Sequence, residues 1–290
     1  MNDDMPIFDC HANIWDKSHF LPLYYEQLGR VRQGELQELA DQDTLYAAME
    51  GVSKAIIFSP RYRDSAGVEG DDKVTAAAVA KYPEKFVGFA FVDPNRDDYV
   101  ALLRNSIEEL GLKGVKIGPI YNGVPLDDPR MSPVYAYCQK NDIPITMHMG
   151  TTFAANAPVE LGRSIHVEPV ARRYPDLKIS LAHMGHPWFE ECIAVVRKQP
   201  NVYAEISALY YRPWQYYNIL IAIQEYKVVD KIFFGTDFPF TTVDESVQGL
   251  RNINSMVSGT GLPRVTKETI NTILHSNPFS HWWHDPILAP

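Results

Sequence analysis

Short runs of β-branched and aromatic residues alternate along this chain with longer amphipathic stretches. The short runs predict eight strands, at Ile7–His11, Lys54–Phe58, Phe86–Val92, Gly114–Ile117, Ile145–His148, Ile179–His183, Val202–Ile206 and Ile232–Gly235. The longer stretches predict helices at Asp43–Glu50, Asp72–Lys81, Tyr99–Leu110, Pro133–Asn141, Val167–Tyr174, Trp188–Lys198, Trp214–Glu225, Asp244–Val257 and Lys267–His275. A strict alternation of strand and helix implies parallel strands joined by helical crossovers.

Eight strand–helix units in 290 residues fit a closed barrel better than an open sheet. We therefore expect an α/β protein with a (β/α)8 barrel, in which residues 1–290 form a single domain. The alternative is an open doubly wound sheet, which should carry a glycine-rich phosphate turn after its first strand. The first strand here runs into HANIWD, which contains no glycine.

Composition and charge exclude several classes of protein. The hydrophobic fraction of 46% supplies a core, and the net charge of −9 without a basic stripe argues against a nucleic-acid partner. The three cysteines are scattered and form no C-x-x-C motif, which favours a reducing compartment. The N-terminus is acidic and no apolar run is long enough to span a bilayer. We expect a cytoplasmic protein with a small-molecule substrate and no membrane partner.

Four polar residues stand at or just after the ends of predicted strands: His11, His148, His183 and Asp237. The carboxyl ends of barrel strands converge at one mouth, and a buried imidazole or carboxylate there is costly unless it is paired or bound to metal. Neutral imidazoles and a carboxylate suit Zn²⁺, and also Fe²⁺ or Mn²⁺. We therefore predict a metal or catalytic cluster, against the alternative that each residue is a hydrogen-bonded structural group.

The same residues carry a family resemblance. FDCHAN resembles the D-x-H-x-H opening of the amidohydrolase superfamily, and HMG, AHMGHPW and GTDFP resemble its later landmarks. YPDLKISLAHMGHPWFEE and PNVYAEIS are especially similar to the aminocarboxymuconate-semialdehyde decarboxylase branch. That branch also contains resorcylate-type decarboxylases, lactone hydrolases and hydratases. The resemblance spans nearly the whole chain.

The resemblance implies roles for these residues. His11, His148 and Asp237 would hold a divalent metal, and Asp237 and His183 would be the acid–base groups. The second histidine of the family motif is replaced by Asn13, whose amide oxygen is a weaker zinc donor than imidazole. Zinc remains the preferred metal, with manganese or iron as alternatives, and the substitution implies loose binding, a different metal or loss of the metal.

Other residues are softer candidates. We expect Arg61, Tyr210 and Arg212, which follow predicted strands, to contact the substrate, with an ordinary salt bridge as the equal alternative for the arginines. Lys116 lies near the end of the fourth strand, where other superfamily branches carry a carbamylated lysine between two metals. A surface or ion-paired lysine is the preferred interpretation here. His186 is expected to shape a turn.

The resemblance implies a metal-dependent hydrolase or non-oxidative decarboxylase that acts on a small carboxylate or lactone. The alternative is a catalytically altered or accessory barrel subunit of a multi-protein metalloenzyme, with an oxygenase as one form. We expect a homodimer or larger oligomer, with a hetero-oligomer as the alternative. The long stretch Ser18–Gln42 is expected to be a lid, a partner contact or a variable surface insertion.

Overall fold

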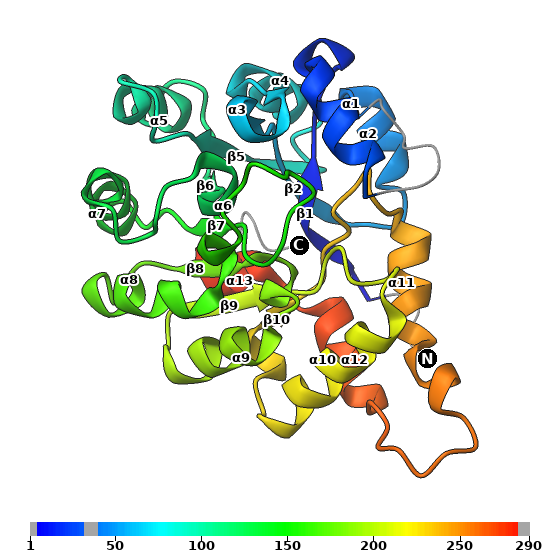
Figure 1. Cartoon of the computed structure of the whole chain (residues 1–290). Helices are drawn as coiled ribbons and strands as arrows, with labels where there is room; N and C mark the ends of the chain where they lie inside the picture. The colour runs from blue at the N-terminus through cyan, green and yellow to red at the C-terminus, as the bar shows by residue number, and fades with distance from the viewer. Residues whose placement is uncertain (1–4, 32–39, 284–290) are drawn as a thin grey trace.

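The computed structural model describes residues 5–31 and 40–283. Eight parallel strands form one sheet, in the order β1-β2-β5-β6-β7-β8-β9-β10 (Figure 1). Their bounds are β1 Phe8–Asn13, β2 Lys54–Phe58, β5 Phe86–Val92, β6 Gly114–Ile117, β7 Ile145–Met147, β8 Ile179–Leu181, β9 Val202–Glu205 and β10 Ile232–Phe233. Each strand pairs with the next one along the chain, as βα repeats require.

Backbone hydrogen bonds join the last strand to the first. The Cys10 amide donates to Phe234 O at 3.0 Å, the Asp237 amide to His11 O at 2.8 Å, and the Asn13 amide to Phe238 O at 2.9 Å. The sheet therefore closes on itself. The predicted α/β class and (β/α)8 barrel are confirmed, and the open doubly wound sheet is excluded.

Helices surround the sheet (Figure 1). The larger ones are α2 Gln42–Ala48, α4 Asp72–Lys81, α5 Tyr99–Glu108, α7 Ser132–Lys140, α8 Val167–Arg173, α9 Phe189–Lys198, α10 Pro213–Glu225, α11 Val243–Arg251 and α12 Lys267–His275. Each helix expected from the sequence overlaps one of them. The helix expected at Asp244–Val257 ends early, at Arg251, and a 3-10 turn over Ile253–Val257 replaces its last part. Within the described chain, no helix is both long and apolar enough to cross a bilayer.

Several strands end earlier than expected. The expected strands reach His148, His183, Ile206 and Gly235, whereas the observed ones stop one or two residues before these positions. At His183 the backbone turns into the left-handed region, with φ of 57°, which no strand can accommodate. These residues therefore leave the sheet and turn into the barrel mouth.

Short elements connect the main ones. They are η1 Lys17–His19, α1 Pro22–Gly29, β3 Arg61–Tyr62, α3 Arg63–Ala66, β4 Val68–Glu69, α6 Pro119–Asn122, η2 Pro129–Met131, η3 Val159–Gly162, η4 Ser164–His166, η5 Ala182–Gly185 and η6 Val229–Lys231. The expected irregular stretch Ser18–Gln42 thus contains helix α1, and its residues 32–39 lie outside the described chain. Tyr24 and Leu28 of α1 line the cavity at the barrel mouth.

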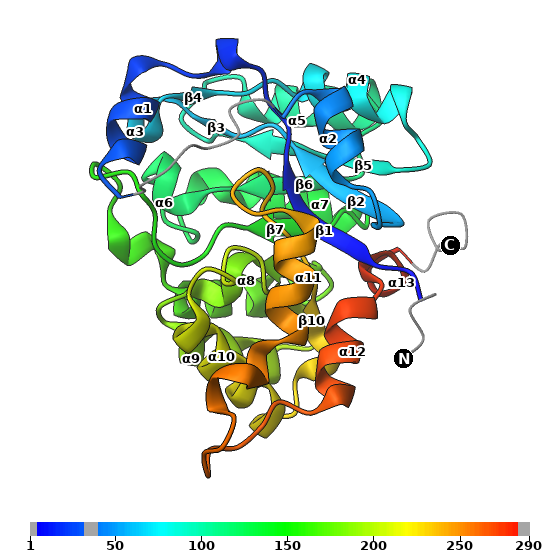
Figure 2. The same ribbon diagram turned by 90° about the vertical axis from the view of Figure 1, so that its right-hand side faces the viewer.

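Aromatic side chains close the opposite end of the barrel. Helix α13, Pro278–Trp282, lies beside the start of β1 (Figure 2). Phe279 packs edge-on against Phe8 with ring centroids 5.8 Å apart, and Trp282 packs edge-on against Phe233 at 5.3 Å. The aromatic C-terminal segment therefore packs against the barrel as far as Trp283, where the described chain ends.

We expect Phe279→Ala to destabilise the protein strongly. Phe279 is fully buried, so the substitution removes a ring and leaves a cavity, which costs about 3–5 kcal/mol of the free energy of unfolding. Leu262→Ala is the matched control, because Leu262 is 44% exposed and should change stability by less than about 0.5 kcal/mol. Denaturant unfolding checks both values, and equal effects of the two substitutions would contradict this account of the barrel base.

Candidate active site

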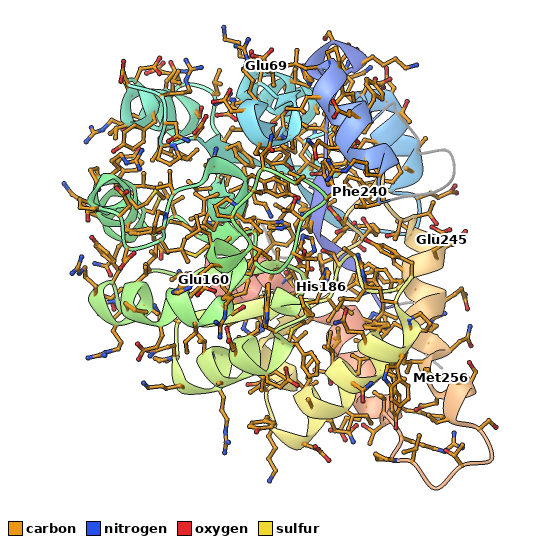
Figure 3. The ribbon with its side chains drawn as sticks, viewed as in Figure 1. Glu69, Glu160, His186, Phe240, Glu245 and Met256 are labelled. Atoms are coloured by element: carbon orange, nitrogen blue, oxygen red, sulfur yellow. The ribbon has the colours of Figure 1, made fainter. Side chains whose placement is uncertain are left out.

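A cavity of about 740 Å³ opens at the carboxyl ends of the strands. Its wall includes His11, Asn13, Lys116, His148, His183, His186, Arg212, Asp237 and a ring of aromatic side chains: Trp15, Tyr24, Phe58, Tyr62, Phe91, Tyr121, Phe153, Tyr211 and Phe240. Figure 3 shows His186 and Phe240 inside the ring of helices, whereas Met256 lies at the outer edge of the molecule. The volume falls within the usual range for small-molecule sites.

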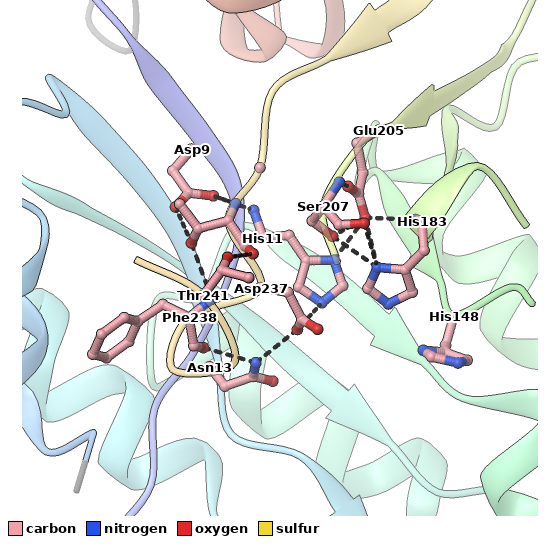
Figure 4. Close-up of polar contacts among 12 residues, drawn as sticks. Asp9, His11, Asn13, His148, His183, Glu205, Ser207, Asp237, Phe238 and Thr241 are labelled. Atoms are coloured by element: carbon pink, nitrogen blue, oxygen red, sulfur yellow. Dashed lines mark hydrogen bonds and ion pairs between the residues drawn. The ribbon is translucent and has the colours of Figure 1, made fainter. Parts of the chain in front are cut away.

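Glu205, at the end of β9, anchors the first histidine of the site (Figure 4). His11 Nδ1 lies 2.8 Å from Glu205 Oε1, and both side chains are buried. Burial lowers the pKa of His11 well below its usual value, so the ring is neutral and carries one proton. Because a carboxylate only accepts, that proton is on Nδ1. His11 Nε2 therefore presents an unshared electron pair, 3.4 Å from Asp237 Oδ1.

The same carboxylate organises His183. The His183 amide donates to Glu205 Oε1 at 3.0 Å, and His183 Nδ1 lies 2.7 Å from Ser207 Oγ. Ser207 Oγ donates its hydrogen to Glu205 Oε1 at 2.9 Å, so His183 Nδ1 must donate to Ser207 Oγ. Burial also lowers the pKa of His183, which keeps the ring neutral. Its Nε2 is therefore unprotonated as well.

Asn13 holds Asp237 in place. Asn13 Nδ2 donates to Asp237 Oδ1 at 3.0 Å and to Phe238 O at 2.9 Å. Both partners are acceptors, which identifies the nitrogen of the amide at this position. Asp237 itself has φ of 62°, a left-handed conformation that is unfavourable for a residue other than glycine. The Asn13 contacts thus orient a carboxylate on a strained backbone.

These groups fit a divalent metal ion. One ligand atom each from His11, His183 and Asp237 lies within 4.8 Å of the others, in the part of the chain that the structure describes. Unshared electron pairs on His11 Nε2 and Asp237 Oδ1 face each other at 3.4 Å, and they repel unless a proton or a cation lies between them. Two neutral imidazoles and one carboxylate are a common donor set for zinc and related metals.

His148 stands beside this cluster. Its ring centroid lies 4.9 Å from that of His183, and 4.8 Å from that of Tyr121. His148 Nε2 is 3.2 Å from Thr151 O, and burial lowers the pKa of the ring, so a neutral His148 donates from Nε2 and keeps its electron pair on Nδ1. The structure thus brings together His11, His148, His183 and Asp237, with His183 rather than His148 in the tightest group.

Three buried residues near the cluster were not predicted from the sequence as functional: Asp9, Glu205 and Ser207. Asp9 accepts hydrogen bonds from the His11 amide and from the amide and hydroxyl of Thr236, and burial raises its pKa to about 7. Asp9 and Glu205 could have been identified from the sequence, because each is a carboxylate inside a predicted strand of mostly apolar residues. An ionisable group buried in a barrel strand needs a partner.

The residues expected to contact substrate divide into two groups. Arg61 donates to Gly70 O and Phe91 O and pairs with Asp72 at 3.3 Å, and Tyr210 donates to Gly235 O. Neither Arg61 nor Tyr210 lines the cavity, and their polar groups are bonded to other parts of the protein. Arg212 does line the cavity, where its guanidinium lies 4.3 Å from the Tyr211 ring centroid. His186 also lines the wall, and burial lowers its pKa to about 4.

Residues 8–279 match a protein-family model described as Amidohydrolase. The 2-amino-3-carboxymuconate-6-semialdehyde decarboxylase of Dictyostelium discoideum is 29% identical over 126 residues, which are 38% of this chain and 35% of that protein. The gamma-resorcylate decarboxylase of Polaromonas sp. strain JS666 is 25% identical over 246 residues, which are 69% of this chain and 73% of that protein. The chain therefore spans about a third of the first relative and most of the second.

Solved structures share the fold. An uncharacterised TIM-barrel protein of Bordetella bronchiseptica superposes with a TM-score of 0.72 at 21% identity, over 94% of this chain and 97% of that one. A 5-carboxyvanillate decarboxylase of Novosphingobium aromaticivorans, complexed with manganese and 4-hydroxy-3-methoxy-5-nitrobenzoic acid, gives 0.68 at 17% identity, over 98% and 97%. A probable 2-pyrone-4,6-dicarboxylic acid hydrolase of Acinetobacter baumannii, with citric acid bound, gives 0.68 at 14% identity, over 97% and 100%. At these identities the likeness establishes the fold.

We expect Glu205→Gln to weaken metal binding. The Glu205 carboxylate accepts from His11 Nδ1, from the His183 amide, and from the amide and hydroxyl of Ser207. A glutamine has only one acceptor oxygen and cannot accept from all four, so the tautomer and orientation of His11 and His183 are no longer fixed. Loss of such an orienting partner typically reduces metal affinity by about 10- to 100-fold. Titration of the metal-depleted protein with Zn²⁺ or Mn²⁺ measures the change.

Asp72→Asn is the matched control for this substitution. Asp72 is also a buried carboxylate with several donors, among them the Phe91 amide and Ser106 Oγ, but it does not line the cavity. We expect it to affect stability and to leave metal affinity within about twofold of the parent. Unchanged metal affinity in Glu205→Gln would show that the histidines do not depend on this carboxylate.

Proposed function

The chain belongs to the amidohydrolase family, and we propose that it is a metal-dependent non-oxidative decarboxylase of small, flat carboxylates. The observation that carries the proposal is that the acceptor nitrogen His11 Nε2 and the carboxyl oxygen Asp237 Oδ1 lie 3.4 Å apart in the cavity wall. Both relatives found by sequence are named as decarboxylases, which supports this reaction over others of the family.

We assign the metal to His11, His183 and Asp237, with His148 as the next group facing the substrate. Zinc is the proposed metal, with manganese or iron as the alternatives, and one solved neighbour holds manganese. When bound, a divalent ion would neutralise a substrate carboxylate and polarise an oxygen beside it. Asn13 acts in this proposal as a positioning residue, because its amide nitrogen faces Asp237 and Phe238 O.

The aromatic wall favours a flat substrate. Tyr62 and Tyr121 stack on each other at 4.1 Å, and Phe91 packs edge-on against Tyr62 at 5.5 Å. Rings held in this way present rigid faces and edges, which bind a planar ring with little loss of side-chain entropy. The cavity of about 740 Å³ leaves room for a single-ring acid with substituents.

Asp237 is the proposed proton carrier. The Asp237 carboxylate takes up a proton from water on Oδ2, the oxygen other than the one that faces His11 Nε2, and passes it to the substrate carbon that bears the carboxylate. The carbon–carbon bond then breaks, its electron pair returns to the substrate ring, and carbon dioxide leaves. The Asp237 carboxylate regains a proton from water. Asn13 Nδ2, 3.0 Å from Asp237 Oδ1, keeps the carboxyl group oriented through the cycle.

Hydrolysis of a lactone is the second candidate. Asp237, oriented by Asn13, is equally placed to accept a proton from water as the water attacks a carbonyl group. A bound divalent ion would then stabilise the oxyanion that develops. The further alternative, an accessory barrel without its own catalysis, has no support from the geometry or from the family.

The direct test is a substrate screen of the metal-loaded protein with aromatic carboxylates and carboxylated lactones. Carbon dioxide release identifies a decarboxylase, and ring-opened acid identifies a hydrolase. Protein depleted of metal with a chelator is the control and should lose turnover until metal is restored. Activity that survives complete metal removal would contradict the metal-dependent mechanism.

We expect Asp237→Asn to reduce turnover by about 10²- to 10⁴-fold, because asparagine keeps the size but neither carries a proton nor bears a charge. The melting temperature should change little or rise, since an active-site carboxylate on a strained backbone is usually a stability liability. Asp244→Asn, at an exposed residue of α11, is the control and should match the parent. An Asp237→Asn protein with full activity would remove Asp237 from the mechanism.

A further inference from the structure

Lys116 places an ammonium group in the wall of the cavity without an acceptor. The residue is 3% exposed and lines the cavity from β6. Lys116 Nζ has no hydrogen-bond partner among the described residues, and its nearest defined contact is the face of Phe58, with the ring centroid 4.7 Å away. The His11 ring packs against the same phenyl ring at 4.9 Å. The ammonium group therefore lies next to the candidate metal cluster.

The buried carboxylates nearby are engaged by other donors. Glu205 accepts from His11 Nδ1, from the His183 amide, and from the amide and hydroxyl of Ser207. Asp9 accepts from the amide of His11 and from the amide and hydroxyl of Thr236. Glu205 and Asp237 balance part of the charge of Lys116 at longer range, but no carboxylate oxygen among the described residues bonds to its nitrogen.

Other partly buried lysines of this protein are satisfied. Lys231 Nζ lies 5.4 Å from the Tyr203 ring centroid and donates to Val196 O and Gln199 O. Lys85 Nζ likewise donates to two backbone carbonyls, at 3.0 and 2.5 Å. A buried ammonium group without such acceptors is costly, so the three donors of Lys116 call for a partner that arrives from outside the protein.

We propose that Lys116 Nζ binds an anionic oxygen of the substrate, so that the cavity selects a flat carboxylate over the neutral amide of the same shape. This inference deepens the proposed function and rests on its cavity. A substrate carboxylate would accept a charge-assisted hydrogen bond from Lys116 Nζ, which has no acceptor among the described residues of the protein. Arg212 adds a second positive charge at the cavity wall, which attracts anions toward the site.

The charge of Lys116 persists near neutral pH. Burial lowers its pKa to about 8, and the nearby carboxylates oppose that shift. The ammonium form therefore predominates at pH 7, where a substrate carboxylate is ionised. The Phe58 face contributes a cation–π contact that holds the nitrogen in position without using any of its three hydrogens.

The test is calorimetric binding of benzoate and of neutral benzamide to the protein as purified, repeated after metal removal. We expect the parent to bind benzoate in both forms. Lys116→Met should raise the benzoate dissociation constant by about 10- to 100-fold in the metal-depleted form and leave that of benzamide unchanged. Its melting temperature should hold or rise, because an unpaired buried charge is removed. Lys116→Gln, which keeps a polar end, should show the same selective loss.

Lys231→Met is the matched control. It also removes a partly buried ammonium group beside an aromatic ring, but this one lies away from the cavity and already has acceptors. It should leave benzoate binding unchanged. Parent protein that does not bind benzoate, or Lys116→Met that binds it normally, would overturn the inference. So would loss of a second metal ion in Lys116→Met, since this would assign the lysine to metal binding.

The binding test does not depend on turnover. If the substrate screen finds no reaction while Lys116→Met loses benzoate selectively, the proposed reaction fails and the anion site stands. If decarboxylation is found while Lys116→Met keeps benzoate affinity, the proposed function stands and the role of Lys116 fails.

Discussion

The buried Glu205 carboxylate is the contact on which the site depends. Glu205 accepts a hydrogen bond from His11 Nδ1 directly, and it orients His183 Nδ1 through the hydroxyl of Ser207. Both imidazoles therefore turn their unprotonated Nε2 atoms toward the cavity. A single acceptor group thereby sets two tautomers at once. A carboxylate behind a metal-binding histidine is a common device for fixing ring orientation and raising ligand basicity. Here Glu205 Oε1 lies on the Nδ1 side of both rings, 2.8 Å from His11 Nδ1 and 3.7 Å from His183 Nδ1.

Several residues at the barrel mouth also have strained backbone conformations. Six described residues other than glycine adopt left-handed φ angles: Asp142 and Lys227 follow the ends of helices α7 and α10, whereas His183, Met184, Ala208 and Asp237 lie at the barrel mouth. The four residues at the mouth follow strand ends, where the chain must leave the sheet and still turn a side chain or a carbonyl inward. Such conformations persist only where the surroundings hold them, and they concentrate at functional sites. The Asn13 bond to Asp237 and the Ser207 bond to His183 are two of the contacts that hold them.

The sequence predicted the barrel because alternating strands and helices leave few other folds, and it placed His11, His148, His183 and Asp237 at one mouth because parallel strands share a direction. It did not reveal which acceptor each ring uses, because Glu205 and Ser207 are adjacent to these rings only after the barrel closes. Arg61 shows what position alone leaves open. A place after a strand is compatible with substrate contact or with a salt bridge, and in the structure Gly70 O and Asp72 are among its partners. Lys116 was expected to be a surface or ion-paired lysine, and both expectations are wrong among the described residues. Its ammonium group is buried, and the oxygens of Glu205 already accept hydrogen bonds from other donors.

The central claim is that His11 Nε2, His183 Nε2 and Asp237 share one divalent metal. Anomalous diffraction from crystals grown with Mn²⁺ tests it most directly. The account predicts one strong anomalous peak within about 2.0–2.3 Å of His11 Nε2 and of an Asp237 oxygen, with Glu205 still bonded to His11 Nδ1. Crystals that hold manganese elsewhere, or an Asp237 carboxylate turned away from His11 with no peak between them, would contradict it.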